Sequence, residues 1–90
     1  MERVVITVTG KDRTGIVANI SSVLAENNVN ILDIRQTIMD DLFTMIMLVD
    51  ISNAKEDFLT LKKKLNEVGE KIGVKVIAQH EDIFKYMHRI

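Results

Sequence analysis

The spacing of apolar residues along this chain switches between simple alternation and helical periodicity, and the order of the switches restricts the fold. Alternating or β-branched stretches predict strands at residues 4–10, 29–39, 42–51 and 74–78. Apolar residues at helical spacing predict one helix around residues 16–24 and another at residues 58–72. The predicted order is therefore strand, helix, strand, strand, helix, strand, followed by a short amphipathic tail.

This order predicts an α+β, ferredoxin-like βαββαβ sandwich, in which two helices cover one face of a four-stranded antiparallel sheet. Ninety residues make a single domain over 1–90, with a core at about 2–80 and a C-terminal helical tail at 81–90. The strand at 42–51 is apolar on both faces, so we expect its second face to be covered too.

The tail carries Ile83, Phe84 and Met87 at helical spacing, with Ile90 at its end. Such an apolar stripe is unusual for a solvated tail, so we expect it to pack on the body of the protein or on a partner subunit. The open sheet face and the free sheet edges also predict a homo-oligomer, and a dimer is the simplest form.

Polar residues and glycines divide the expected elements. Asp12 or Thr14 is expected to cap the first helix, and Asn27-Asn28 is expected to end it. Ser52-Asn53 is expected to form a turn and to cap the second helix, which Gly69 and Gly73 would then end.

Two irregularities are expected in the strands. The alternation shifts phase near Ile31-Leu32, which indicates a β-bulge or a late strand start. Asp40-Asp41 is a polar break of hairpin length between the second and third strands.

Composition excludes several classes of function. The chain has no cysteine, which excludes disulfides and thiolate metal sites. Only 4% of its residues are aromatic, so we expect its five methionines to help fill an aliphatic core or a subunit contact. The formal net charge of −1 argues against nucleic-acid binding. His80 and His88 lack further ligands nearby in the sequence, so no metal site and no cofactor are expected.

Targeting signals are not recognisable in the sequence. No charged and apolar leader segment precedes the first strand, and the densest apolar stretch, residues 42–49, is too short to span a bilayer. We therefore expect a cytoplasmic protein that does not enter membranes.

The stretch Gly10-Lys11-Asp12-Arg13-Thr14-Gly15-Ile16-Val17 lies between the first strand and the first helix and is the strongest candidate site. Free N–H groups at the start of a helix, with the positive end of its dipole, favour a carboxylate or phosphate. Asp12 adds a negative charge beside them. Amide donors next to a carboxylate suit a zwitterion, and a free amino acid is the simplest one.

This stretch, followed by Asn28-Val29-Asn30-Ile31 at the start of the second strand, resembles the ACT domain family. The resemblance covers about residues 2–80. It is strongest to free-standing ACT proteins, including those similar to the glycine-cleavage-system repressor. ACT domains are regulatory modules with the βαββαβ fold that usually bind amino acids, often at a dimer interface.

The resemblance implies that Asp12 and Asn30 contact the ligand and that Gly15 lets the backbone approach it. Gly10 and Arg13 complete the candidate ligand-binding set, with Arg13 available for a second carboxylate. Some ligand-binding members carry a histidine at the position of Gly10. Because glycine has no side chain, this chain lacks that one side-chain contact with the ligand.

The same residues also have structural explanations. Gly10 and Gly15 could serve a tight turn or close packing, Asp12 could cap the helix, and Asn30 could satisfy the turn before it. Arg13 could be a solvated loop residue. These alternatives stay open at the level of sequence.

The favoured function is a non-catalytic regulatory module that binds an amino acid or a related metabolite and acts through dimerisation. One alternative is a protein-interaction or structural module without a ligand, with an unidentified regulated protein as its partner. A less favoured one is an acylphosphatase-like hydrolase, for which Arg13 and Asn30 offer only a faint similarity. No catalytic residue is identified, because no histidine, cysteine or carboxylate pair is placed at the loop, so an enzyme is not expected.

Overall fold

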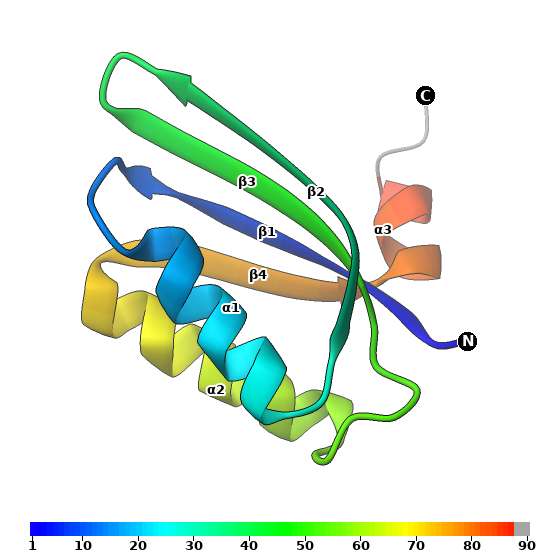
Figure 1. Ribbon diagram of the computed structural model, residues 1–90. Helices are drawn as coiled ribbons and strands as arrows, with labels where there is room; N and C mark the ends of the chain where they lie inside the picture. The colour runs from blue at the N-terminus through cyan, green and yellow to red at the C-terminus, as the bar shows by residue number, and fades with distance from the viewer. Residues whose placement is uncertain (88–90) are drawn as a thin grey trace.

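The computed structural model describes residues 1–87 and has the predicted order of elements (Figure 1). The strands are β1 (Arg3–Lys11), β2 (Asn30–Met39), β3 (Leu42–Asp50) and β4 (Val74–His80). The helices are α1 (Ile16–Glu26), α2 (Phe58–Ile72) and α3 (Glu81–Met87). His88 and Ile90, which the sequence analysis considered in the tail, lie outside the described residues.

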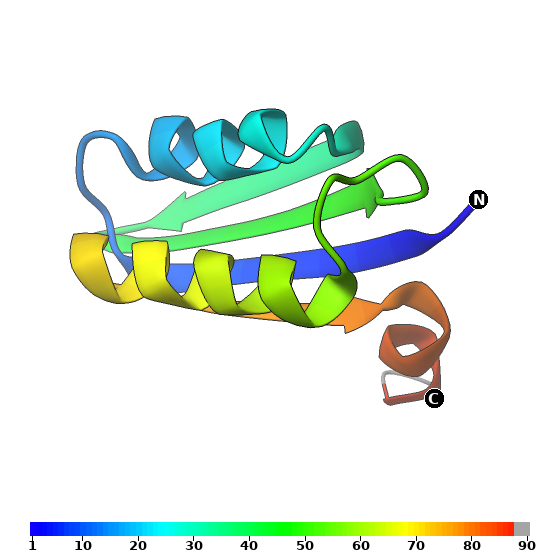
Figure 2. The same cartoon turned by 90° about the horizontal axis from the view of Figure 1, so that it is seen from below.

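The four strands form one antiparallel sheet in the order β2-β3-β1-β4. Both α1 and α2 lie on one face of this sheet, as Figure 2 shows from below. The prediction of a ferredoxin-like α+β sandwich is therefore confirmed. The two edge strands, β2 and β4, differ in their cover: α2 packs along β4, whereas every residue of β2 except Leu32 is exposed.

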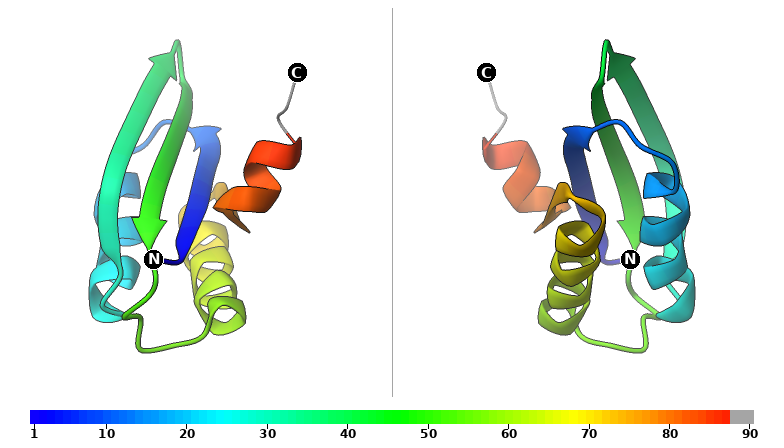
Figure 3. Two further views of the ribbon diagram at one scale, coloured as in Figure 1. Left: turned by 90° about the vertical axis from the view of Figure 1, so that its right-hand side faces the viewer. Right: turned by 90° about the vertical axis from the view of Figure 1, so that its left-hand side faces the viewer.

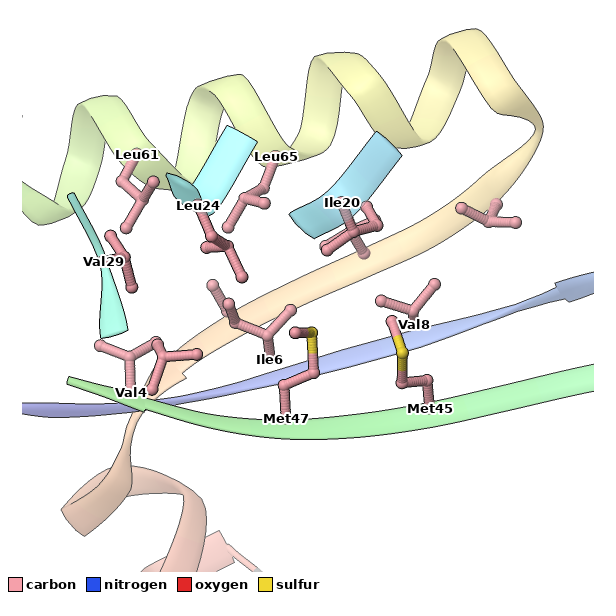
Figure 4. Packing of buried hydrophobic residues seen from close by; sticks show 14 of the residues in the cluster. Val4, Ile6, Val8, Ile20, Leu24, Val29, Met45, Met47, Leu61 and Leu65 are labelled. Atoms are coloured by element: carbon pink, nitrogen blue, oxygen red, sulfur yellow. The ribbon is translucent and has the colours of Figure 1, made fainter. Parts of the chain in front are cut away.

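The core lies between the sheet and the two helices and is almost entirely aliphatic (Figure 4). Residues that alternate along β1 and β3 meet the inner faces of α1 and α2. Among the residues with no exposed surface are Val4, Ile6, Val8, Ile20, Leu24, Met45, Met47, Val49 and Leu65. Met45 and Met47 thus fill the core as expected, whereas Met39 at the end of β2 is exposed.

The opposite face of the sheet is partly covered by α3 (Figure 3). This short helix contacts β1 and β4 and leaves Val5, which points away from α1 and α2, only 6% exposed. Gln79 in β4 donates from Nε2 to Sδ of Met87 at 3.1 Å. Residues 81–87 therefore lie against the body as expected, but two residues of the expected apolar stripe, Ile83 and Met87, remain 54% and 61% exposed.

Local irregularities in the strands follow the sequence closely. The register between β2 and β3 shifts between Ile31 and Asp33, so the strand is irregular where the phase shift in the sequence indicated a bulge or a late start. Asp40 has a φ of 57° in the hairpin between β2 and β3. Such left-handed backbone is tolerated by Asp and Asn better than by most residues, which is why a polar pair forms this turn.

The expected helix caps were wrong at both N-termini. Gly15, and neither Asp12 nor Thr14, is the N-cap of α1, and no side chain of the described residues caps that helix. Ser52-Asn53 forms a turn, but Asp57 caps α2, accepting a hydrogen bond from the N–H of Thr60 at 2.8 Å. Each helix therefore begins later in the chain than the positions of the polar residues indicated.

The end of α2 corrects a third expectation. Gly73, with a φ of 80°, ends the helix as predicted. Gly69 does not end it but lies buried inside α2, where the helix passes close to β4. The glycine is therefore explained by close packing between two elements and not by a chain reversal.

Candidate functional site

The loop between β1 and α1 lies beside the hairpin that joins β2 to β3 (Figure 1). The N–H of Asp12 donates to the carbonyl oxygen of Asp41 at 2.6 Å, which fixes the loop to the tip of the sheet. Asp12, Arg13 and Thr14 are all exposed. The carboxylate of Asp12 is thus presented to solvent on a backbone that is itself anchored.

The first turn of α1 has free backbone donors. Gly15 precedes it with a φ of 91°, in the left-handed region that glycine adopts readily. Its carbonyl oxygen accepts both the N–H of Asn19 at 2.9 Å and Nδ2 of Asn19 at 2.7 Å. Among residues 1–87 no side chain caps the helix, and no acidic residue lies in its first turn, so the positive end of the helix dipole is open there.

Gly10 has a packing role that does not involve this loop. It lies in β1 between Phe43 of β3 and Val74 of β4. A Cβ atom on Gly10 would lie 2.9 Å from Cγ1 of Val74. Since real Cβ atoms do not approach other carbon atoms so closely, the start of β4 requires glycine here.

Arg13 is also occupied by a structural contact. Its guanidinium lies over Gly73, so that a Cβ atom on Gly73 would lie 3.4 Å from Nη1 of Arg13. Gly73 ends α2, and a cation near the C-terminal end of a helix interacts favourably with the helix dipole. The loop therefore bridges α1 and the end of α2.

Asn30 lies at the opposite end of the sheet from the loop. Asn30 is the cross-strand partner of Asp50 in β3, and Asp50 is the cross-strand partner of Arg3 at the start of β1. The loop follows Lys11 at the other end of this nine-residue strand. At about 3.3 Å per residue the two ends are on the order of 25 Å apart, so one small ligand cannot touch Asp12 and Asn30 of the same subunit.

A separate polar cluster surrounds the start of β1, and the sequence offered no signal for it. Nε2 of His80 lies 2.8 Å from Oε2 of Glu2, and the ring of His80 packs on Phe58 with centroids 4.2 Å apart. The N–H of Glu2 donates to Oγ of Ser52, which donates to Asp50 at 2.6 Å. The hydrogen bonds that the hydroxyl and the backbone N–H of Ser52 donate to Asp50 hold the pKa of the Asp50 carboxyl below its ordinary value.

This cluster lines a hollow of about 530 Å³, which is far from the β1–α1 loop. Every side chain in it has a partner or is exposed, and the salt bridge of Arg3 to Glu81 closes one side at 3.4 Å. The volume reflects an open corner between the chain start and α3. We therefore assign the candidate ligand site from the free helix amides and not from this hollow.

Residues 1–87 also lack two other features, a metal-ligand cluster and a membrane-spanning helix. In this part of the chain no three His, Cys, Asp or Glu side chains are grouped so that they could hold a metal ion. The same part contains no helix long and apolar enough to cross a bilayer.

The βαββαβ order and the sheet order β2-β3-β1-β4 define a ferredoxin-like α+β module. Residues 2–79 match the ACT domain family, and the chain belongs to that family. ACT domains are typically ligand-binding regulatory modules. The resemblance identified from the sequence is thus confirmed.

Relatives of the same length occur in archaea and bacteria. A UPF0237 protein of Methanocaldococcus jannaschii is 77% identical over 90 residues, covering 100% of both chains. A UPF0237 protein of Clostridium perfringens is 57% identical over 86 residues, covering 96% of this chain and 97% of the relative.

Solved structures agree with the fold. An ACT domain protein from Streptococcus pneumoniae has 42% identity and a TM-score of 0.80, covering 93% of this chain and 94% of that one. A putative glycine cleavage system transcriptional repressor has 26% identity and a TM-score of 0.73. The alignment covers 88% of this chain but only 45% of that protein, so the similarity concerns one part of the larger protein.

Proposed function

We propose that this protein is a non-catalytic sensor that binds a free amino acid, or a similar small zwitterion, at the β1–α1 loop. The observation that carries the proposal is the uncapped N-terminus of α1 beside the exposed carboxylate of Asp12. The helix amides suit the ligand carboxylate, and Asp12 suits its ammonium group. Arg13 contributes by holding the loop against the end of α2.

A second subunit would complete this site. β2 is an edge strand, and its helix-side residues Ile34 and Ile38 are exposed because α1 does not extend over them. A two-fold axis beside β2 would pair it with its copy in the antiparallel sense and would cover these side chains.

Such a pair would also bring the candidate residues together. Antiparallel pairing sets the start of one β2, where Asn30 lies, beside the end of the other at Met39. Met39 is the cross-strand partner of Leu42, and Leu42 is the cross-strand partner of Lys11, which lies next to the loop. The partner's Asn30 would therefore approach Asp12 across the interface, although the two lie at opposite ends of a single subunit.

The exposed side of α1 favours the same arrangement. Ala18, Ser22 and Ala25 are exposed at helical spacing and carry small side chains. Small residues let a second helix approach closely, so two copies of α1 could pack beside each other over the joined sheets.

A thermal-shift screen against the common amino acids tests the proposal. A ligand at 100 times its dissociation constant adds about 2.7 kcal/mol to the free energy of unfolding, which raises the Tm of a small domain by several degrees. Asp12→Asn is the informative variant, because it should weaken binding of an amino acid more than of the matching carboxylic acid without an ammonium group.

The alternatives predict different results. A protein-interaction module would show no shift with any amino acid. An acylphosphatase-like hydrolase would turn over a generic acyl phosphate, but within one subunit the separation of Arg13 from Asn30 and the contact of Arg13 with Gly73 disfavour it.

A further inference from the structure

The edge strand β4 has a free side that is suited to pairing with another strand. In the sheet β4 neighbours only β1, and the register between them runs without a shift from Val74 to His80. Every second residue of such a strand turns its N–H and C=O groups away from its neighbour. No loop or helix backbone group among the described residues hydrogen-bonds to residues 74–77. This stretch therefore offers backbone donors and acceptors to a further strand.

The helix α2 forms a wall along the same edge. It runs beside β4 in the opposite direction (Figure 2). Phe58, at the start of α2, packs on His80 at the end of β4, with ring centroids 4.2 Å apart. Gly69, near the end of α2, lies against Val76 in the first half of β4. A groove of about 410 Å³ lies between the helix and residues 74–77 of the strand.

The wall of this groove has a spacing that fits an extended chain. Its side chains from α2 are Lys62, Asn66 and Glu70. Residues four apart in a helix lie on the same side, about 6 Å apart along its axis. Alternate side chains of a strand lie about 6.6–6.8 Å apart. Successive residues of the wall therefore match alternate side chains of a strand that runs beside β4.

The wall also has a polarity along its length. Lys62 lies toward the end of β4, Glu70 lies toward its start, and the neutral Asn66 lies between them. Neither charged group has an ion pair within residues 1–87, and Nζ of Lys62 lies 6.0 Å from the centroid of the Phe58 ring. The groove thus presents one free positive and one free negative charge at opposite ends.

The other side of β4 adds two further features. Lys75 and Ile77 alternate with the buried Val74 and Val76, so they point to the sheet face opposite α2, and both are exposed. Lys75 has no ion pair within the described residues. A strand beside β4 would therefore meet polar and charged groups on the α2 side, and one aliphatic and one basic side chain on the other.

We propose that an extended peptide segment of a partner protein adds to β4 as a further strand and fills the groove beside α2. Its side chains on the α2 side include an acidic one beside Lys62 and a basic one beside Glu70. Its side chains on the other face include an aliphatic one beside Ile77 and an acidic one beside Lys75. Main-chain hydrogen bonds hold the segment, and the charges set its register and direction.

A second copy of this chain fits the β4 edge less well than a peptide does. Pairing at β4 in addition to the proposed pairing at β2 would extend the sheet from subunit to subunit without closing. A peptide segment has no second edge to extend. The β4 edge lies on the other side of the sheet from β2, so a peptide there leaves the proposed dimer and its ligand site intact.

Fluorescence anisotropy with two labelled peptides, both capped at their ends, tests the proposal. The sequence Thr-Glu-Val-Thr-Glu-Lys, added antiparallel to β4, sets its first Glu beside Lys62 and its Lys beside Glu70, because directly opposite residues share a sheet face. The sequence Thr-Lys-Val-Thr-Glu-Glu has the same composition with these two charges exchanged, and it should bind several-fold more weakly. Lys62→Glu combined with Glu70→Lys should reverse the preference.

A matched variant controls for the change in net charge. Glu67 is exposed on the side of α2 that faces α1, where it lines a different groove with Val23. Glu70→Lys alone should reduce the preference for the first peptide, whereas Glu67→Lys should leave it unchanged. Failure of the first peptide to bind, or equal binding of the two peptides to the wild-type protein, would overturn the proposal.

Backbone pairing has a signature of its own. The N–H groups of successive residues in an antiparallel strand point alternately toward and away from the partner strand. N-methylation of the valine in the first peptide, and separately of the threonine that follows it, should therefore have unequal effects. One methylated peptide should lose binding and the other should retain it. Binding that survives both methylations would contradict strand addition.

Light scattering identifies the other occupant of the edge. Glu70→Lys should leave the mass of the assembly unchanged, and a smaller mass would show that a second copy, and not a peptide, occupies β4. Asp12→Asn separates this proposal from the proposed function. It should weaken amino-acid binding at the β1–α1 loop without changing the affinity for the peptide, so either proposal can fail while the other stands.

Discussion

Gly69 in α2 and Val76 in β4 approach so closely that a Cβ atom on Gly69 would lie 2.7 Å from Cγ2 of Val76. The same atom would lie 2.9 Å from the carbonyl oxygen of Val74. One of these neighbours is backbone, so it cannot turn aside. The contact sets how deeply α2 lies on the edge of the sheet.

Gly69→Ala should therefore destabilise the protein, although alanine is the better helix former by about 0.5–1 kcal/mol. Overpacking of this kind costs typically about 1–3 kcal/mol, so we expect a net loss of unfolding free energy in urea titrations. Ser22→Ala, at an exposed position of α1, is the control and should leave stability unchanged or slightly raised. A more stable Gly69→Ala variant would show that α2 can move away from β4.

Asn30→Ala should weaken ligand binding by about 10- to 100-fold, because a charge-assisted hydrogen bond contributes about 1.5–3 kcal/mol. Calorimetry with a ligand found by screening measures this. Mixing Asn30→Ala subunits with Asp12→Ala subunits should restore tight sites, since one of the two sites in a mixed dimer is intact. Recovery is absent if both residues serve sites within a single subunit.

Asp57→Ala should lower the Tm at neutral pH, because Asp57 caps α2. Hydrogen bonds from the Thr60 side chain and backbone lower the pKa of Asp57 from its ordinary value of 3.8. A carboxyl with a lowered folded-state pKa stabilises the fold above pH 3.8, and the gain disappears as the pH falls through the folded pKa. The Tm difference between wild type and Asp57→Ala should accordingly shrink in acid. A difference that is constant with pH would exclude the charged cap.

Deletion of residues 82–90 should expose Val5 and lower stability. Returning one buried valine to water costs about 1.5 kcal/mol, and the Arg3–Glu81 salt bridge is retained in this variant. Thermal melting and light scattering should show a lower Tm and a smaller assembly. If both are unchanged, α3 has no structural role.

The order of the elements and the direction in which most side chains point were determined by the sequence. Alternation places Val4, Ile6 and Val8 on one face of β1 whatever its neighbours are, because successive strand residues point to opposite faces. The hairpin at Asp40 and the end of α2 at Gly73 were likewise readable, since they depend on backbone conformations that few residue types adopt.

The candidate site was only partly readable. The free amides of α1 depend on a glycine directly before the helix, which is a local feature of the sequence. The N-cap itself was wrongly predicted at Asp12 or Thr14. The contact of Arg13 with Gly73 and the close approach of Gly69 to Val76 join segments that are distant in the chain. The periodicity of apolar residues gives no information on such contacts, because it reflects only neighbours along the chain.

The separation of Asp12 from Asn30 shows the same limit most clearly. The sequence placed both residues next to helix α1, one before it and one after it. A helix of eleven residues carries the chain along the whole sheet before β2 begins, so its two ends lie far apart. Sequence determines which residues flank an element, because those relations are local. Tertiary structure decides which of them meet, because strand order and packing join residues that the chain keeps apart.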